Sequence, residues 1–193
     1  GGFNPQEQLD TYFQQQALQS GKKIGGLETP QSQLDMLFKS QTLQRQANLL
    51  YCLVSDIDKA MEQTKRLNNA YKAQNLDEML KLIEERDGNS CDPQPGEMEA
   101  MLDNRNKAWI EKMPALMKDA PTLFVVGAGH LPGTNGVLNL LKQQGYTVNA
   151  RYRVVASDLW SPAFIKKGTS GNTPDIPSNL SICSSSHIHR IGS

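Results

Sequence analysis

One segment, Thr122 to Gly145, constrains the fold more than any other. It opens with TLFVV, a run of β-branched and aromatic residues that is typical of a buried strand. A glycine-rich loop, Gly127 to Gly133, follows it, and Thr134 is placed to cap an amphipathic helix that ends at Gly145. A further strand is expected to begin at Tyr146. A strand, a helix and a strand so close together predict a parallel crossover, and hence an α/β domain.

The chain before this segment has mostly helical spacing. Apolar residues share one helix face from Leu9 to Ala17. KKIGGL, Lys22 to Leu27, is short and bounded by turns, which favours a strand that would deliver Glu28 to a sheet edge. From Gln31 to Ala73 apolar residues recur at spacings of three and four, which predicts two amphipathic helices packed as a hairpin.

Two more helices are expected before the buried strand, at Leu76 to Arg86 and at Glu97 to Lys118, with a loop between them at Asn89 to Gly96. Residues 31–118 are therefore expected to be mainly helical. The second of these helices has four candidate buried positions: Met101, Leu102, Trp109 and Met113. The expected fold is α/β, with a mostly parallel sheet, flanking helices and the inserted helical hairpin.

Composition excludes several classes of protein. The chain has 20 Lys and Arg residues against 20 Asp and Glu residues, so its net charge of zero argues against a nucleic-acid partner. No apolar run approaches the roughly 20 residues of a membrane span. The cysteines Cys52, Cys91 and Cys183 lack CxxC spacing, which argues against a thiolate zinc site. Cys52 and Cys91 are equally compatible with a disulfide and with two free thiols.

His130 is the first candidate for chemistry. The end of a parallel strand that opens into a helix is where open α/β sheets bind ligands, because free backbone N–H groups gather there. His130 is the titratable side chain of this loop, so it could serve as a metal ligand or a general base. The alternative is a surface histidine without a function. Function tends to concentrate at such loops, which favours the first interpretation.

Glu28 and Arg105 are further candidates. Glu28 follows the expected short strand, so it could converge with His130, or it could simply favour the next helix N-terminus. Arg105 lies four residues before Trp109 and shares its helix face, close to the buried margin. An arginine there needs an anionic partner, and Glu28 is an available carboxylate. The alternative is an ordinary solvated face at Asn104, Arg105 and Asn106.

Two other patterns carry less weight. GAGHLPG could be a dinucleotide-phosphate loop, with Arg151 and Arg153 suited to a 2′-phosphate. Its spacing differs from GxGxxG, however, and no acidic residue ends the next strand. His187 and His189 could chelate a metal, but residues 151–193 lack any sustained periodicity. We expect that segment to be an irregular tail or an artificial extension.

Three segments in order resemble the TraB/GumN family, which includes the Tiki proteases. They are GLETPQSQLD (Gly26 to Asp35), DNRNKAW (Asp103 to Trp109) and VGAGHLPGTNGVLNLLKQQGYTV (Val126 to Val148), of which the last is the most specific. The resemblance covers most of the chain, so residues 1–150 are expected to form a partial domain of this type. The fold it implies is similar to that of erythromycin esterase-like proteins.

The resemblance also implies a site. The family shares two GxxH motifs, a glutamate and an Asn/Arg pair; His130 matches the second motif, Glu28 the glutamate, and Asn104 with Arg105 the pair. It thus implies a metal-dependent hydrolase, of the peptidase type, that acts on a peptide or small-molecule substrate. His130 and Glu28 would hold a divalent metal ion, and Glu28, Arg105 and Asn104 would be catalytic. The alternative is a non-catalytic protein that binds a peptide or signal molecule.

The chain departs from the family in one respect. It has a single GxxH motif, and it begins without Met. We therefore expect the first motif and the opening strands of the sheet to lie upstream of Gly1, and this fragment alone to be inactive. A signal peptide in that upstream segment would place the protein in the periplasm or cell envelope rather than the cytoplasm.

Overall fold

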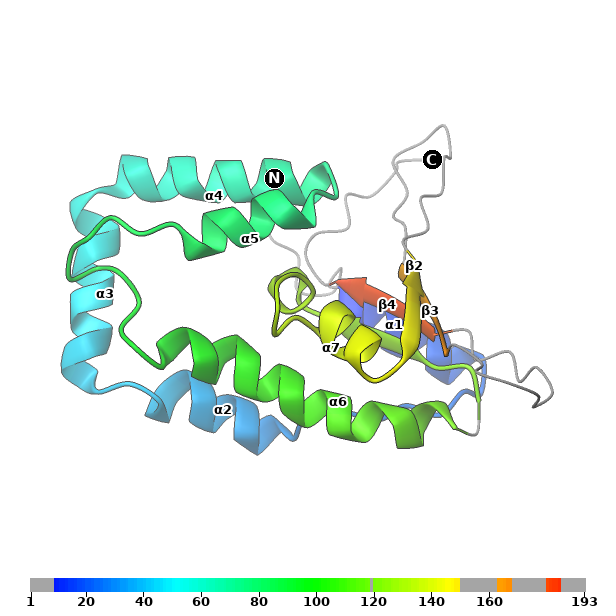
Figure 1. Cartoon of the computed structure of the whole chain (residues 1–193). Helices are drawn as coiled ribbons and strands as arrows, with labels where there is room; N and C mark the ends of the chain where they lie inside the picture. Colours follow the sequence, from blue (N-terminus) through cyan, green and yellow to red (C-terminus); the bar gives the residue numbers. More distant parts are fainter. Residues whose placement is uncertain (1–8, 119, 150–162, 168–179, 185–193) are drawn as a thin grey trace, which may run out of the picture. The chain divides into compact units, whose positions relative to one another are not determined.

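A computed structural model describes residues 9–118, 120–149, 163–167 and 180–184 (Figure 1). Most of these residues are helical, and the strands are short. The chain divides into two compact units. The first comprises residues 1–27, 112–128 and 141–193, and the second comprises residues 28–111 and 129–140. Among the described helices, none combines the length and apolar character that a bilayer crossing requires.

The first unit holds helix α1 (Leu9–Gln19) and the strands β1 (Leu123–Val126), β2 (Tyr146–Asn149), β3 (Ala163–Lys167) and β4 (Leu180–Ser184). Their order in the sheet is β1-β4-β3-β2. β1 pairs with β4 in parallel, with Phe124 opposite Ile182. The pairs β4–β3 and β3–β2 are antiparallel.

This arrangement confirms two strands but does not confirm a mostly parallel sheet. TLFVV and the segment from Tyr146 form β1 and β2 as predicted. A direct crossover would make β1 and β2 neighbours, whereas β4 and β3 lie between them in the sheet order. Both of these strands come from residues beyond 150, so the segment expected to be an irregular tail contributes two strands. Arg151, Arg153, His187 and His189 lie outside the described residues.

The strand predicted at Lys22 to Leu27 is wrong. These residues form neither helix nor strand, and Ile24 is 45% exposed. Gly25 and Gly26 explain the difference, because glycine loses more backbone freedom than other residues on entering a strand and has no side chain to pack. Lys112 holds the segment from α6 instead, since its Nζ donates to the Leu27 carbonyl over 2.8 Å.

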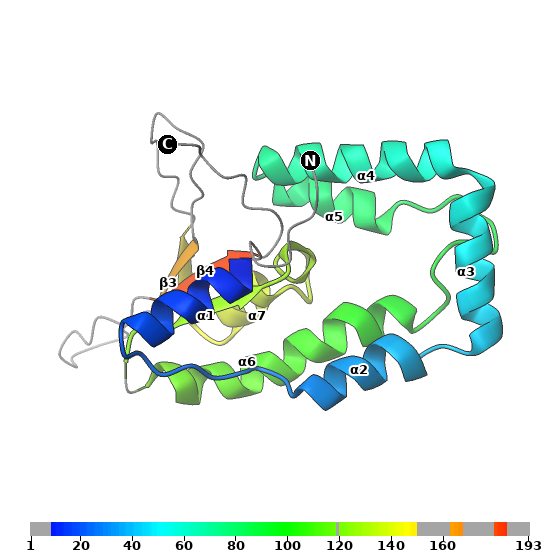
Figure 2. The same ribbon diagram turned by 180° about the vertical axis from the view of Figure 1, so that it is seen from behind.

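The second unit is helical. It contains α2 (Pro30–Lys39), α3 (Leu43–Ser55), α4 (Ile57–Lys72), α5 (Leu76–Glu84), the π-helix η2 (Glu99–Asp103) and the first part of α6 (Asn104–Met117). Each of the four helices α2 to α5 has an N-cap side chain that accepts a backbone N–H: Thr29, Thr42, Asp56 and Asn75. Both views show α4 beside α5 and α2 beside the first part of α6 (Figure 1, Figure 2).

The predicted hairpin is therefore shifted along the chain. α4 packs mainly against α5 and makes far fewer contacts with α3, the helix before it. Asp56 interrupts the helical stretch, because its backbone at φ −140°, ψ 64° ends α3 and starts α4. The apolar stripe does not continue across this break. Its members stay exposed, with Leu50 at 61%, Val54 at 60% and Met61 at 64%.

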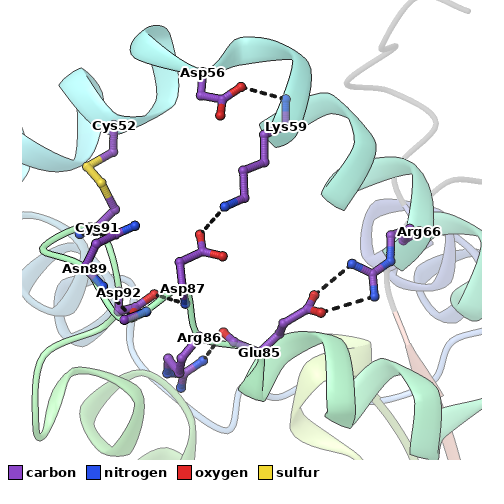
Figure 3. Close-up of polar contacts among 11 residues, drawn as sticks. Cys52, Asp56, Lys59, Arg66, Glu85, Arg86, Asp87, Asn89, Cys91 and Asp92 are labelled. Carbon is purple, nitrogen blue, oxygen red and sulfur yellow. Dashed lines mark hydrogen bonds and ion pairs between the residues drawn. A yellow bond between two sulfur atoms is a disulfide. The ribbon is translucent and has the colours of Figure 1, made fainter.

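A disulfide and several ion pairs hold the loop after α5 (Figure 3). Cys52 of α3 is bonded to Cys91, which decides between the two states that the sequence left open. Further contacts to α4 come from two ion pairs, Lys59–Asp87 at 2.6 Å and Arg66–Glu85 at 2.8 Å. The carboxylate of Asp92 accepts three backbone N–H groups, from Asp87, Gly88 and Asn89.

The buried face of α6 agrees in part with the sequence. Trp109 and Met113 are buried, with exposures of 4% and 0%, as predicted. Met101 is 43% exposed and Leu102 is half-buried, so these two predictions are wrong. Both lie in η2, where the wider turn of a π-helix changes the helical phase from which the face was predicted.

Candidate functional site

Arg105 and Glu28 form a two-point ion pair within the second unit. Arg105 is in the first turn of α6, and its Nε and Nη2 donate to the two carboxylate oxygens of Glu28 over 2.8 and 2.9 Å. The arginine and glutamate side chains are 20% and 13% exposed. Glu28 lies just before α2, but Thr29 caps that helix by accepting the backbone N–H of Ser32. The carboxylate therefore faces the arginine.

The environment keeps Glu28 ionised. Burial would raise the pKa of its carboxyl group, but the hydrogen bonds and positive charge of Arg105 outweigh burial. A longer hydrogen bond from Gln33 Nε2, at 3.4 Å, acts in the same direction. The pKa of Glu28 is consequently lower than its ordinary value. Near neutral pH the site thus pairs a full negative charge with a full positive charge.

His130 lies against the same guanidinium. It ends the short 3₁₀ turn η3 (Ala128–His130) that follows β1, and it is 7% exposed. Its Nε2 is 3.2 Å from Nη1 of Arg105, and its ring lies 4.4 Å from the Trp109 ring, centroid to centroid. Burial, and then the charge of Arg105, lower the pKa of His130 to about 4, against a smaller opposing effect of Glu28. The imidazole is therefore neutral at physiological pH.

The hydrogen bonds of Asn106 determine which ring nitrogen carries the proton. The Asn106 Nδ2 donates to the Asn135 carbonyl over 2.8 Å, so its Oδ1 is the atom that faces His130 Nδ1, at 2.7 Å. An amide oxygen only accepts, hence Nδ1 must carry the hydrogen. Arginine only donates, so Nε2 must present its lone pair to Arg105. His130 is thus fixed as the Nδ1–H tautomer with an unprotonated Nε2.

Asn106, and not Asn104, is the asparagine that joins the cluster. Asn106 is 2% exposed, whereas Asn104 is exposed and its side chain has no hydrogen bond to a described residue. The two residues point to different sides of α6 because they are two positions apart on a helix. The sequence offered both Asn104 and Asn106 as candidates beside Arg105, and the Asn/Arg pair of the family matches Asn104. A signal was present in the sequence, since Asn106 lies three residues before the buried Trp109.

Trp109 completes the cluster from one turn further along α6. The guanidinium carbon of Arg105 lies 5.1 Å from the centre of its ring, which is a cation–π contact. Its indole Nε1 has no hydrogen-bond partner among the described residues, although it is buried. The indole N–H helps to lower the pKa of Glu28 without reaching hydrogen-bond geometry. A buried donor without a partner is uncommon, and this one is directed at the Glu28 carboxylate.

The loop after His130 folds back onto α6 through two glycines and Asn135. Gly133 has a φ of +86°, a region that favours glycine. A Cβ at Gly136 would lie 2.1 Å from the Pro132 carbonyl oxygen, so no side chain fits there. Asn135 Nδ2 donates to the Asp103 carboxylate over 2.8 Å, and this bond fixes the carbonyl that Asn106 uses. Gly133 belongs to the predicted glycine-rich loop, whereas Asn135 and Gly136 were not predicted as part of the site.

The same loop does not have the geometry of a dinucleotide-phosphate loop. Helix α7 (Val137–Gln143) begins well after Gly129, and Thr134 is therefore not its cap. A phosphate loop needs its glycines to open directly into the helix N-terminus. Here a 3₁₀ turn and several bends separate Gly127 and Gly129 from the N-terminus of α7.

The two predicted metal ligands do not fit a metal ion on their own. A catalytic metal ion such as zinc usually has three protein ligands, and the described residues contain no group of three His, Cys, Asp or Glu side chains arranged to hold one. Both oxygens of Glu28 accept from Arg105, and the lone pair of His130 Nε2 faces the same cation. A metal at Nε2 would lie beside a guanidinium and be repelled by it.

Comparison with known proteins gives a family for the chain. The model of the TraB/PrgY/gumN family matches residues 1–150. No curated protein and no solved structure matches the chain. The match contains the three segments that carry Glu28, Arg105 and His130, which the structure brings together. The chain belongs to the TraB/PrgY/gumN family.

Proposed function

We propose that this chain carries the catalytic groups of a hydrolase, of the peptidase type, and that Arg105 is the centre of its site. The observation that carries the proposal is the guanidinium itself, which donates both to Glu28 and to the unprotonated Nε2 of His130. Three segments far apart in the sequence supply these residues. Membership of the family is compatible with a Tiki-like peptidase, and this compatibility favours the hydrolase over the alternative binding function.

The geometry supports distinct roles for these groups. Four guanidinium N–H groups of Arg105 have partners, namely Glu28 twice, the Met101 carbonyl and His130. Guanidinium has five such donors, so one on Nη2 is left for the carbonyl oxygen of a substrate. Glu28 positions the cation by its two-point contact. His130 presents an unprotonated Nε2 that can accept a proton, although its pKa of about 4 makes it a weaker base than an ordinary imidazole.

In the proposed reaction, a water molecule replaces the contact of 3.2 Å between Arg105 and His130. Nε2 accepts a proton from this water while its oxygen forms a bond to the carbonyl carbon. The negative charge that develops on the carbonyl oxygen is stabilised by Arg105. When the C–N bond breaks, the proton on Nε2 passes to the leaving amine, and His130 returns to its neutral form.

The first test is a cleavage assay on the chain and on any longer form that its gene encodes. Each is incubated with a degenerate mixture of unstructured peptides, with and without added divalent cations, and new termini are identified by mass spectrometry. We expect cleavage to fall about 100- to 1,000-fold in Arg105→Gln, as for loss of a donor to an oxyanion. Asn104→Ala is the matched control, since Asn104 is the exposed neighbour of Arg105.

The outcomes separate the hypotheses. Full activity of Arg105→Gln and of His130→Gln would remove both residues from the reaction. Equal metal content in the wild type and in His130→Ala, measured by mass spectrometry, would remove the predicted role of His130 as a metal ligand. Total absence of cleavage by every form and with every cation would contradict the hydrolase proposal.

A second candidate function is the binding of a peptide or signal molecule without cleavage. It is favoured by the exposed apolar side chains of α2 to α4, among them Leu37 at 58%, Phe38 at 65% and Leu50 at 61%. Contiguous exposed apolar residues mark interaction surfaces in many proteins. Saturable binding of a peptide that no form of the protein cleaves would support this function.

The disulfide supports a particular kind of compartment. Disulfides persist in oxidising compartments and are rare where thiols are kept reduced. The Cys52–Cys91 bond therefore supports the proposal of a periplasmic or cell-envelope location.

A further inference from the structure

A cavity of about 400 Å³ lies in the second unit, close to the candidate site. Its walls come from the end of α2, the start of α3, the loop at residues 94–97 and the π-helix η2. The volume is in the range of ordinary ligand pockets. A hollow of about 460 Å³ on α3 and α4 shares no residue with the cluster around Arg105.

Met101 connects the cavity with Arg105. The residue lines the cavity, while its carbonyl oxygen accepts from Arg105 Nη1 over 3.0 Å. Met101 belongs to η2, a π-helix that leads directly into the first turn of α6. Such π-turns inside helices are rare and frequently occur at functional sites. A molecule in the cavity would consequently lie next to the backbone that holds the guanidinium.

The charged residues of the cavity wall neutralise each other. Arg45 is 6% exposed, and its Nε and Nη2 each donate to the Glu97 carboxylate over 2.9 Å. Its remaining contacts are to backbone carbonyls of Ser90 and Asp92. Burial of a charged ligand needs an unpaired opposite charge, and this wall offers none. The cavity is therefore unsuited to a charged group.

The rest of the lining is uncharged and mixed, with the polar side chains of Ser40, Gln41 and Thr42 beside apolar ones, and it suits an uncharged side chain attached to a peptide backbone. Met36, Ala100 and Met101 contribute thioether and methyl groups, which adapt to apolar side chains of different shape. Gln94 is exposed at the rim, and its side-chain amide has no hydrogen-bond partner among the described residues. An amide of this kind can both donate to and accept from a peptide bond.

We propose that this cavity is the specificity subsite of the site at Arg105, and that it takes an uncharged aliphatic or thioether side chain of a peptide. The inference rests on the proposed hydrolase function for its consequence in catalysis, but binding in the cavity is independent of cleavage. The substrate is thus a peptide with an apolar residue near the bond that is cleaved.

Binding is tested by NMR of the chain labelled with ¹³C at the methionine methyl groups. The probes are N-acetyl-leucine methylamide and N-acetyl-methionine methylamide, compared with the corresponding lysine and glutamate compounds. We expect saturable shifts of the Met36 and Met101 signals with the two apolar probes only. Equal shifts with the charged probes, or no shift of these two signals, would overturn the proposal.

Two tryptophan variants sharpen the test. Gln94→Trp places an indole in the cavity, and the exposed position should leave the fold intact. Gln63→Trp is the matched control, because Gln63 is exposed on α4 and lines neither hollow. We expect the shifts to disappear in the first variant and to persist in the second. Persistence of the shifts in Gln94→Trp would contradict the assignment of the probe to this cavity.

Cleavage of the peptide mixture then separates the two proposals. Cleavage next to apolar residues should fall roughly tenfold or more in Gln94→Trp, since pocket contacts of this size discriminate by such factors. Binding without any cleavage would reject the hydrolase and retain the cavity as a peptide site. Cleavage by the wild type with the same preference in Gln94→Trp would retain the hydrolase and reject the subsite.

Discussion

The second unit contains two Arg–Glu pairs that look alike and are completed differently. Arg45 and Arg105 each make a two-point contact with a glutamate, Glu97 and Glu28, at distances of 2.8 to 2.9 Å. Arg45 directs its other contacts to the carbonyls of a loop that a disulfide also holds. Arg105 directs one of its other contacts to the unprotonated nitrogen of His130.

This difference distinguishes a structural pair from a candidate catalytic pair. Every partner of Arg45 is an acceptor that does not titrate near neutral pH, so the pair closes a loop and supports the cavity wall but transfers no proton. The surroundings of Arg105 include a titratable ring and the buried indole N–H of Trp109, and Arg105 is more exposed than Arg45, 20% against 6%. Those features are what binding and proton transfer require.

Replacement of Arg45 gives the largest expected effect and tests the first half of the comparison. Arg45→Met leaves the Glu97 carboxylate mostly buried without its partner, which should lower the free energy of unfolding by about 3–5 kcal/mol. Chemical denaturation measures this loss. Arg105→Met should lose less stability, because Arg45 also donates to two loop carbonyls and Arg105 to only one carbonyl, but it should lose the activity. A greater loss of stability in Arg105→Met would reverse the two assignments.

Removal of the disulfide should have the next largest effect on the same region. The bond joins residues with a sequence separation of 39, so its loss is expected to cost roughly 3 to 4 kcal/mol through the freedom gained by the unfolded chain. Denaturation of the double variant Cys52→Ser, Cys91→Ser measures the change. The pKa of His130 should stay low, since no atom of the bond belongs to its cluster. A large change in that pKa would show that the two regions are coupled.

Acid should weaken the Arg105 region through His130. Its pKa falls from 6.5 to about 4 on folding, so the unfolded chain takes up the proton first as the pH falls. The stability is therefore complete above about pH 6.5 and lost as the pH falls to 4, by about 3 kcal/mol in total. The lowered pKa of Glu28 adds a loss in the same direction, below its ordinary value of 4.5.

Denaturation at pH 7 and pH 4.5 measures this dependence. The control is Asn104→Ala, which should keep the same slope against pH because Asn104 is exposed and its side chain does not titrate. The slope should be smaller in His130→Gln, which cannot titrate. A slope that is unchanged in His130→Gln would exclude this histidine as its source.

Local patterns in the sequence predicted the parts of the site that depend on near neighbours. The strand β1 and the loop with His130 followed from composition, and the shared face of Arg105 and Trp109 followed from helical spacing. The pairing of Arg105 with Glu28 followed from the need of a partly buried arginine for a carboxylate. Each of these inferences depends on one short segment of sequence, or on the rule that a partly buried charge needs an opposite charge beside it.

The parts that depend on distant pairing were not predictable in this way. The order of the sheet is decided by contacts of β3 and β4 with strands far away in the chain. The disulfide could likewise be predicted only by knowing that α3, which carries Cys52, lies beside the loop that carries Cys91. The helical hairpin was predicted within Gln31 to Ala73, but the packed pair is α4 and α5. The apolar spacing in the sequence continues across Asp56, and it therefore gave no sign that Asp56 ends α3 and caps α4.

Asn106 differs from these cases because its signal was in the sequence. It lies on the same stripe as the buried residues Trp109, Ile110 and Met113, at spacings of three, four and seven. A polar residue on a buried stripe has to find hydrogen-bond partners, since burial without them is costly. The family pattern drew attention to Asn104 instead, which the helix directs to solvent.

The pair Asn106 and Asn104 gives the last and smallest prediction. Asn106→Leu removes the acceptor of His130 Nδ1 and the donor to the Asn135 carbonyl, so two buried polar groups lose partners. We expect a loss of roughly 1–3 kcal/mol in the free energy of unfolding. The ring of His130 should also lose its single tautomer, which ¹⁵N NMR of the imidazole nitrogens detects.

Asn104→Leu is the matched control, with an expected change within about 0.5 kcal/mol because the residue is exposed and unpaired among the described residues. If Asn106 only filled space, Asn106→Leu would keep the Nδ1–H tautomer, because a leucine occupies a similar volume. A tautomer that persists would therefore separate packing from positioning. In that case Arg105, which can only donate, keeps Nε2 unprotonated by itself, and the base in the proposed reaction remains.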